Sequence, residues 1–573
     1  MHNPERPMMR RAIGPMRALL CAAAILSALP CARAQTAPGA GDMVRTLPPP
    51  PALAPAASMP PAPPFRTPAP PPQVNGLQGF ELKEVRFTPT EAIGPAELWA
   101  LAAPYLNRRV EAADLAAFAK ALQQLYADRG FGLVAIALPS QNLTQGTLNV
   151  VIVEPRFGRV TLVQGSEPPI SEARARGLMA STGVQAGRPL NLKQLDRAMF
   201  SLNDLPGTGA KATLAPSGDE GVFDLVVETE GRRVWDMTLD FDNHGSRSTG
   251  IDRLGALMRW NNPLHIGDNL DLRLLASERA GLTLGRLAYE APLGDTPWRA
   301  LIGLSRVEYE LGGSFSALQA NGVATVRDAG VSYPLIRSRG RNLIVRLGVE
   351  DKVLEDRFDA LALRTDKRIR NLVASAAFED RDELWGDGFN GASLQAQVGR
   401  LRIDTDHVRA EDAVLGAQAT QGDFGKLNLQ LSRLQAISQR VLLYAGLTGQ
   451  WASKNLDGAE KLTLGGARGV RAYPTAEAPS DEGVVFSTEL RCFVNPSWTV
   501  FGLYDRAKGR LRKRPDDGAD NTRVLDGAGI GLYFSDPRLF TLKATLAWRG
   551  RERPQSESGN DSPRLYMQLQ RPF

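Results

Sequence analysis

Apolar and polar residues alternate along most of the chain beyond about residue 232. The segments DNLDLRLLAS, SRVEYEL and KLNLQLSRL each place an apolar residue at every second position, with polar or charged residues between. About sixteen such segments of roughly ten residues follow one another, separated by turn residues. This pattern predicts strands with two unlike faces, and it is typical of an all-β transmembrane barrel with charges on its inner face.

A large soluble β-sandwich or propeller is the alternative interpretation. The segments are long, and nearly all have two unlike faces. Short and long connections alternate between them, which favours the barrel. The chain ends on Phe573, in phase with Leu565, Met567 and Leu569, although Arg571 breaks the phase. A terminal aromatic strand is typical of outer-membrane barrels, so we expect Phe573 to act in targeting. Closure would also remove unpaired strand edges from lipid.

Before residue 232, helical periodicity alternates with strands. Residues 80–156 read as β-α-α-β-β, with a strong amphipathic helix over Val110–Gly130. The same order recurs over residues 157–232, so the chain contains an internal repeat of one small α+β unit. We therefore expect two such domains, 80–156 and 157–232, followed by a barrel over 233–573.

The N-terminal segment indicates export. A basic stretch with Arg10, Arg11 and Arg17 precedes an apolar run and the cleavage-type motif Ala32-Arg33-Ala34, which predicts a signal peptide over 1–34. Residues 35–79 read as a proline-rich periplasmic linker. Two of the three cysteines would leave with the signal peptide, so we expect no internal disulfide. No other apolar run approaches the length of a transmembrane helix.

Composition and motifs give no enzymatic signature. The net charge is +6, but the arginines are scattered rather than grouped with aromatic residues, so nucleic acid is not an expected partner. The four histidines lack zinc spacing, and GGARG is not a phosphate-binding loop. We expect no catalytic residue, metal or cofactor, and we interpret the acidic residues of the strands as the lining of a polar lumen.

The order of elements, together with four motifs, resembles the two-partner secretion transporters of Gram-negative bacteria, the haemolysin and adhesin secretion-activation proteins. The two repeats resemble POTRA domains, and SLNDLPG resembles the end of a helix in the second of them. GVRAYP resembles the V-R-G-Y/F signature of a long loop, here residues 460–483. GVVFSTELRCFV and VFGLYDRAKG resemble the next two strands. The signature residues are Val470, Arg471, Ala472 and Tyr473, with alanine where glycine is usual.

The resemblance implies a barrel of sixteen strands, with this loop folded back into its lumen. Arg471 would pair with an inward carboxylate of the wall, with Asp505 as the expected partner and Glu489 and Arg491 nearby. A wet lumen would make such a pair worth only on the order of 1 kcal/mol. The family's N-terminal plug helix is not expected in its usual form, because Gln35–Thr46 is short and contains proline and glycine. Whether residues 35–46 form one is left open.

The repeats also carry a partner hypothesis, because an open sheet edge can accept another strand. By the family's strand order, one edge spans Leu133–Leu138, with Leu133, Ala135, Ile136 and Leu138 as candidate substrate-contacting residues. The other edge spans Ala210–Ala215. The alternative is that the repeats serve only as spacers between the membrane and the periplasm.

The resulting prediction is a pore-forming transporter in the outer membrane, with periplasmic N-terminal domains that capture an unfolded exoprotein for export through the barrel. The barrel assembly machinery and outer-membrane lipid are its other expected partners. An outer-membrane protein assembly factor of the same superfamily is the alternative, and a passive porin or an enzyme-bearing barrel is a third. The identity and activation of the cargo and the oligomeric state are not readable from the sequence.

Overall fold

The computed structural model describes residues 37–46, 79–414, 419–515, 520–557 and 561–573. The predicted signal peptide and most of the predicted linker lie outside the described residues. Within the described ranges, none of the helices is both long and apolar enough to cross a membrane.

The first α+β unit builds a three-stranded sheet, in the order β2-β5-β4, beside two helices. Asp114 accepts a hydrogen bond from the backbone N of Glu111 at 3.0 Å, which satisfies a donor at the start of the long helix. The apolar stripe of that helix, with Phe118, Leu122 and Tyr126, is buried in the unit's own core. The elements are β1 (Phe80–Leu82), β2 (Glu84–Phe87), α3 (Pro95–Ala102), η1 (Ala103–Tyr105), β3 (Arg108–Val110), α4 (Ala112–Asp128), β4 (Ala135–Ala137) and β5 (Thr147–Val153).

The second unit repeats this design with longer strands. Its sheet has the order β6-β8-β7, and side-chain N-caps from Ser171 and Asn191 begin its two helices. A separate core contains Phe157, Met199 and Leu225. The elements are β6 (Arg156–Gln164), α5 (Glu172–Ser181), α6 (Leu192–Asn203), β7 (Thr208–Pro216) and β8 (Val222–Gly231).

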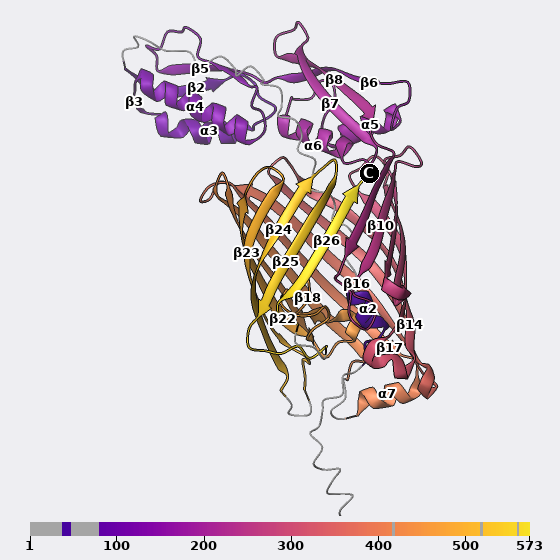
Figure 1. Cartoon of the computed structure of the whole chain (residues 1–573). Helices are drawn as coiled ribbons and strands as arrows, with labels where there is room; N and C mark the ends of the chain where they lie inside the picture. The colour runs from indigo at the N-terminus through magenta and orange to yellow at the C-terminus, as the bar shows by residue number, and fades with distance from the viewer. Residues whose placement is uncertain (1–36, 47–78, 415–418, 516–519, 558–560) are drawn as a thin grey trace, which may run out of the picture. The chain divides into compact units, whose positions relative to one another are not determined.

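The remaining strands form a closed barrel, which confirms the predicted fold class (Figure 1). All neighbours are antiparallel, and the last strand, β26, closes the ring against the first, β9. The sixteen strands are β9 (Trp235–Asp242), β10 (Arg253–Asn261), β11 (Asn269–Ser277), β12 (Leu282–Pro292), β13 (Arg299–Glu310), β14 (Ala320–Arg337), β15 (Arg341–Phe358), β16 (Leu363–Asp382), β17 (Gly388–Ile403), β18 (Gly422–Ser438), β19 (Val441–Ala452), β22 (Glu482–Phe493), β23 (Trp498–Arg510), β24 (Thr522–Asp536), β25 (Phe540–Arg549) and β26 (Arg564–Pro572).

The short elements between these strands lie in the connections. They are η2 (Glu278–Ala280), η3 (Gly313–Leu318), η4 (Asp359–Leu361), α7 (Asp406–Ala413), η5 (Gly458–Glu460), β20 (Leu462–Thr463) and β21 (Pro479–Ser480).

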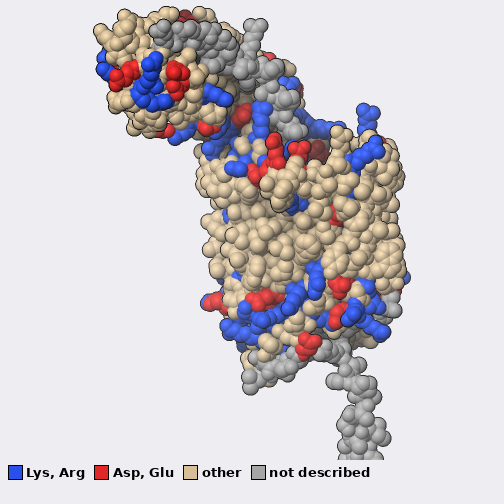
Figure 2. Space-filling view, turned by 90° about the vertical axis from the view of Figure 1, so that its left-hand side faces the viewer, with Lys and Arg blue, Asp and Glu red and all other residues tan. Residues whose placement is uncertain are grey.

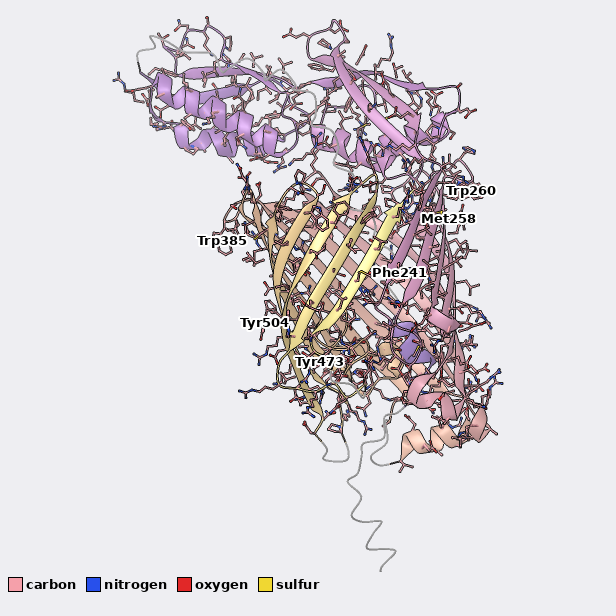
Figure 3. All side chains as sticks on the ribbon, viewed as in Figure 1. Phe241, Met258, Trp260, Trp385, Tyr473 and Tyr504 are labelled. Carbon is pink, nitrogen blue, oxygen red and sulfur yellow. The ribbon has the colours of Figure 1, made fainter. Side chains whose placement is uncertain are left out.

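Aromatic side chains mark one rim of the barrel wall. Trp235 at the start of β9 stacks on Trp260 at the end of β10, with ring centroids 4.9 Å apart, and Trp385 lies at the same rim (Figure 3). On the face of the barrel in Figure 2, the middle of the wall is nearly free of charged residues. Because the chain enters β9 directly from the second α+β unit, this rim is the periplasmic one. The aromatic girdle and apolar band are those of a barrel in lipid.

The predicted alternation, apolar outside and charged inside, holds in the middle of the wall, but toward the extracellular rim charged residues also appear on the outer face. In β11, Leu272 and Leu274 face outward, and Asp271 faces the lumen. In β13, by contrast, Val307 and Tyr309 are buried inside the barrel, whereas the adjacent arginine and glutamates face outward. Charges therefore lie on both faces at this end, because Lys352 and Asp356 of β15 still point into the lumen. The lumen there is filled by protein, so inward positions pack against it and outward ones meet water.

Candidate functional site

Two segments occupy the lumen. One is the long connection between β19 and β22, residues 453–481, which contains η5, β20 and β21. The other is a short helix, α2 (Ala40–Thr46), which lies inside the ring of strands in Figure 1. We call residues 453–481 the lumenal loop. Any solute that crosses the barrel must pass these two segments.

Arg471 of the lumenal loop is bound to two carboxylates of the wall. Its Nε and Nη2 donate to the two oxygens of Asp505 at 2.8 and 2.7 Å, and its backbone N donates to Asp505 Oδ2 at 3.1 Å. Its Nη1 donates to Glu489 Oε1. Asp505 lies on β23 and Glu489 on β22, so one guanidinium joins the loop to two adjacent strands. Such planar, bidentate pairing is specific to arginine.

This cluster is buried, contrary to the expectation of a wet lumen. Arg471, Glu489 and Asp505 are only 5%, 2% and 0% exposed. Glu489 also accepts from Arg491 at 2.8 Å and from Tyr533 at 3.2 Å, so its oxygens are well satisfied. Burial opposes the charged form of Arg471, but the two carboxylates outweigh it and raise the pKa of the guanidinium. Removing one member would leave an uncompensated buried charge, which typically costs about 3–5 kcal/mol.

The other signature residues shape the loop around this arginine. A Cβ at Gly469 would lie 2.2 Å from the carbonyl oxygen of Leu464, so only glycine fits there. Position 472 does not require glycine, because the φ angle of Ala472 is not positive. The side chain of Ala472 is almost fully buried. The Tyr473 hydroxyl donates to the carbonyl of Glu552 at 3.1 Å. Val470 and Tyr473 belong to an apolar cluster that the loop shares with β22–β25.

A second anchor of the lumenal loop was not predicted from the sequence. Glu460 is 2% exposed and binds Lys352 and Lys426 at 2.8 and 2.6 Å. It also accepts from Gln397 at 2.8 Å and Asn371 at 3.1 Å. Burial opposes ionisation of Glu460, but the two ammonium groups outweigh it and lower its pKa. The anchor is therefore charged at neutral pH.

The Glu460 partners come from four consecutive strands, β15–β18, whereas Arg471 binds β22 and β23. The loop is thus held on two separate arcs of the wall. No local motif marks this anchor, because Lys352 lies 108 residues from Glu460 in sequence. The signal that the sequence offered was that Lys352 and Lys426 occupy inward-facing positions of their strands.

The helix α2 answers the question, left open by the sequence, of whether residues 35–46 form a helix in the lumen. Its first backbone donor, Ala40 N, binds Asp356 Oδ1 on β15 at 2.6 Å, and the same oxygen accepts from Tyr309 of β13 at 2.5 Å. At its other end Arg45 donates to the carbonyl of Gly458 in the lumenal loop at 2.8 Å. The helix is only seven residues long, and it begins after the proline and first glycine that disfavoured it.

The candidate substrate-contacting residues differ in exposure, and not all of them lie on the edge strand. In the first unit, β4 spans only three residues and excludes Leu133 and Leu138. Ala135 is exposed and Ile136 is buried, while Leu133 packs against the core of the second unit. The second predicted edge lies in β7, which has nine residues and, among the residues that the structure describes, pairs only with β8.

The last residue lies at the closure of the barrel. The Phe573 backbone N donates to the carbonyl of Met237 on β9 at 2.8 Å, and its side chain is half exposed. Across the described ranges, no three His, Cys, Asp or Glu side chains are arranged to hold a metal ion.

Comparison with known sequences identifies both parts of the chain. The family of haemolysin secretion/activation proteins, ShlB/FhaC/HecB, matches residues 221–534, and the ShlB-type POTRA domain matches residues 80–155. The heme/hemopexin transporter protein HuxB of Haemophilus influenzae is 26% identical over 488 residues, 82% of this chain and 84% of that protein. The outer membrane transporter CdiB of Escherichia coli is 23% identical over 75% of this chain and 71% of its own.

Solved structures show the same fold. CdiB from Escherichia coli superposes with a TM-score of 0.71 at 19% identity, covering 88% of this chain and 92% of that one. CdiB from Acinetobacter baumannii gives a TM-score of 0.66 at 16% identity, covering 87% and 91%.

Proposed function

This chain belongs to the family of haemolysin secretion/activation proteins, ShlB/FhaC/HecB, and we propose that it exports its exoprotein by releasing α2 while the lumenal loop stays anchored. It is an outer-membrane transporter of two-partner secretion with periplasmic POTRA domains. The observation that carries the proposal is the unequal attachment of the two segments in its lumen.

The lumenal loop is attached far more firmly than α2. Arg471 and Glu460 each make several buried charge-assisted contacts, and the loop adds an apolar cluster with the wall. The helix α2 has a few polar contacts, through Ala40 and Arg45, and only seven residues. Helices this short have little stability of their own. Release of α2 therefore costs less than release of the loop.

Removal of Ala40–Thr46 is expected to increase ion conductance in planar bilayers several-fold, because the lumen loses one of its two occupants. Asp356→Ala should shift conductance in the same direction, since it removes the acceptor of Ala40 N. Asp359→Ala, three residues along on exposed η4, is the matched control and should conduct like the unmodified protein. Unchanged conductance in both the deletion and Asp356→Ala would contradict release of α2 as the opening step.

Capture of the exoprotein is assigned to the open edge of β7. Asn203 bonds both the N and the carbonyl oxygen of Ala210, at 3.1 and 2.9 Å, so these groups point away from β8. Backbone groups of an antiparallel strand alternate in direction, so Ala212 and Leu214 present theirs to the same side. A cargo strand could add there by β-augmentation. The three-residue β4 offers too little edge to do this alone.

Ala212→Pro is expected to lower export about tenfold, because it removes one edge donor and places a ring on the docking side. The cargo is taken as the large protein that disappears from the culture medium when the transporter is deleted. Its amount in the medium is compared with the amount of heat-modifiable barrel in the outer membrane. Ala212→Ser keeps the N–H and is the control. Normal export by a well-inserted Ala212→Pro protein would exclude this edge.

The remaining partners and the absence of catalysis belong to the same proposal. The closed barrel requires insertion into lipid, for which the barrel assembly machinery is the proposed partner. The buried charged groups of the lumen bind one another as anchors, so we assign them no catalytic role. Cargo folding outside the cell would supply the driving force.

A further inference from the structure

The outward surface of β14–β18 carries a row of charged side chains toward the extracellular rim. In the strand register Arg327 lies opposite Asp351, Asp351 opposite Arg370, Arg370 opposite Arg400, and Arg400 opposite Asp423. The arginines of this row are 60–72% exposed. The row is therefore a continuous charged line across five strands of the outer wall.

The next outward row toward the periplasm is apolar. It contains Ala329, Val349, Leu372, Val398 and Gly425, again directly opposite one another in register. Val349, Leu372 and Val398 are half exposed, as expected of side chains that face hydrocarbon. The abrupt change from apolar to charged residues places the boundary between hydrocarbon and headgroups between the two rows.

A groove crosses this boundary. Its volume is about 920 Å³, and both rows line it, the charged one on the extracellular side and the apolar one on the periplasmic side. A second groove of about 490 Å³ adjoins it, sharing Leu372, Val398 and Gly425, and continues past Leu427 and Trp451. The small residues of the wall, such as Gly425, leave the space between the larger side chains. Together the grooves offer a charged end and an apolar channel.

The charged end has an excess of arginine. Asp351 is contacted by three guanidinium groups, from Arg368 at 2.6 Å, Arg327 at 3.3 Å and Arg370 at 3.5 Å. Arg400 binds Asp423 at 2.5 Å. Four arginines thus face two carboxylates. Arg370 and Arg400 are also direct cross-strand neighbours, an arrangement of like charges that is unfavourable unless an anion lies between them.

We propose that this groove binds a lipid A-type phosphoglycolipid of the outer leaflet. A phosphate sits between Arg370 and Arg400, and an acyl chain follows the apolar channel along Leu372, Val398 and Leu427. A phosphate matches the two surplus positive charges and the forked geometry of arginine. A protein partner would match the charged row, but it would not reach an apolar channel at hydrocarbon depth. The inference rests on the outer-membrane location and is independent of how export proceeds.

Binding is measured on the purified full chain in detergent by native mass spectrometry. Bis-phosphorylated lipid A should bind saturably, and Arg370→Gln/Arg400→Gln should weaken it at least about tenfold. Arg306→Gln is the control, since this exposed outward arginine of β13 pairs with Glu308 and lies outside the groove. Val398→Trp fills the channel and should also weaken binding of the acylated lipid.

Three further ligands separate the contributions of the phosphate, the lipid headgroup and the acyl chain to affinity. Dephosphorylated lipid A should bind at least about tenfold more weakly, and phosphatidylglycerol and inorganic phosphate should compete poorly. Equal binding by the double variant and the unmodified protein would overturn the site. Equal binding of phosphatidylglycerol would overturn the lipid A assignment. If inorganic phosphate competed with an affinity equal to that of lipid A, the site would be a simple anion site. That result would overturn the role of the apolar channel. Retained heat-modifiable mobility establishes that each variant is folded.

Discussion

Arg471→Ala should nearly abolish secretion while the barrel remains in the outer membrane at its normal level. The substitution leaves Asp505 and Glu489 buried without the guanidinium that neutralises them, a loss of about 3–5 kcal/mol. A shift of that size changes a two-state equilibrium by roughly two to four orders of magnitude. The loop should therefore leave its place on the wall. The barrel keeps its closed hydrogen-bonded ring and should still insert.

The readouts are cargo in the medium, heat-modifiable barrel, and protease cleavage of the lumenal loop in intact cells. Arg471→Lys should also fail, because an ammonium cannot make the bidentate contacts. Asp505→Asn should resemble Arg471→Ala, and the double variant should be no worse than either, as expected for residues in one contact. Arg506→Ala, an exposed outward neighbour on β23, is the control. Additive defects in the double variant would show that the loop is anchored elsewhere.

Deletion of Phe80–Val153 should abolish secretion and leave a conducting barrel. This first unit has its own core, built around residues such as Leu82, Leu122 and Tyr126, so its loss does not open the barrel. It supports the second unit, however. Leu133 packs on the second core, and Asn191 donates to the carbonyl of Arg129 at 2.9 Å. The second unit, which carries the capture edge on β7, would therefore lose these contacts.

Leu122→Asp provides a second route to the same result, because a carboxylate in the first core unfolds that unit without shortening the chain. Cargo in the medium, bilayer conductance and outer-membrane level are measured together. Lys120→Ala, an exposed position on the same helix α4, is the control. Secretion at the normal rate from the deletion or from Leu122→Asp would remove the first unit from the export pathway.

Local pattern was sufficient for the architecture of this protein. Period-two alternation predicted the barrel, and helical stripes such as that of α4 predicted the two repeated units. Both follow from burying one face of each element, which is a property of neighbouring residues in sequence. The family resemblance added the expectation that Arg471, Asp505 and Glu489 meet, and the structure brings them together.

What occupies the lumen was decided only by the tertiary structure. The Glu460 anchor joins residues from four strands and one loop, and α2 is held by side chains more than 250 residues away, so no local pattern encodes either. These occupants explain why Arg471 is buried in what was expected to be a wet lumen. They also explain why Val307 and Tyr309 face inward near the extracellular rim. Alternation defines two faces of a strand, but the medium on each side, protein, lipid or water, sets which residues each face carries, and that depends on the complete fold.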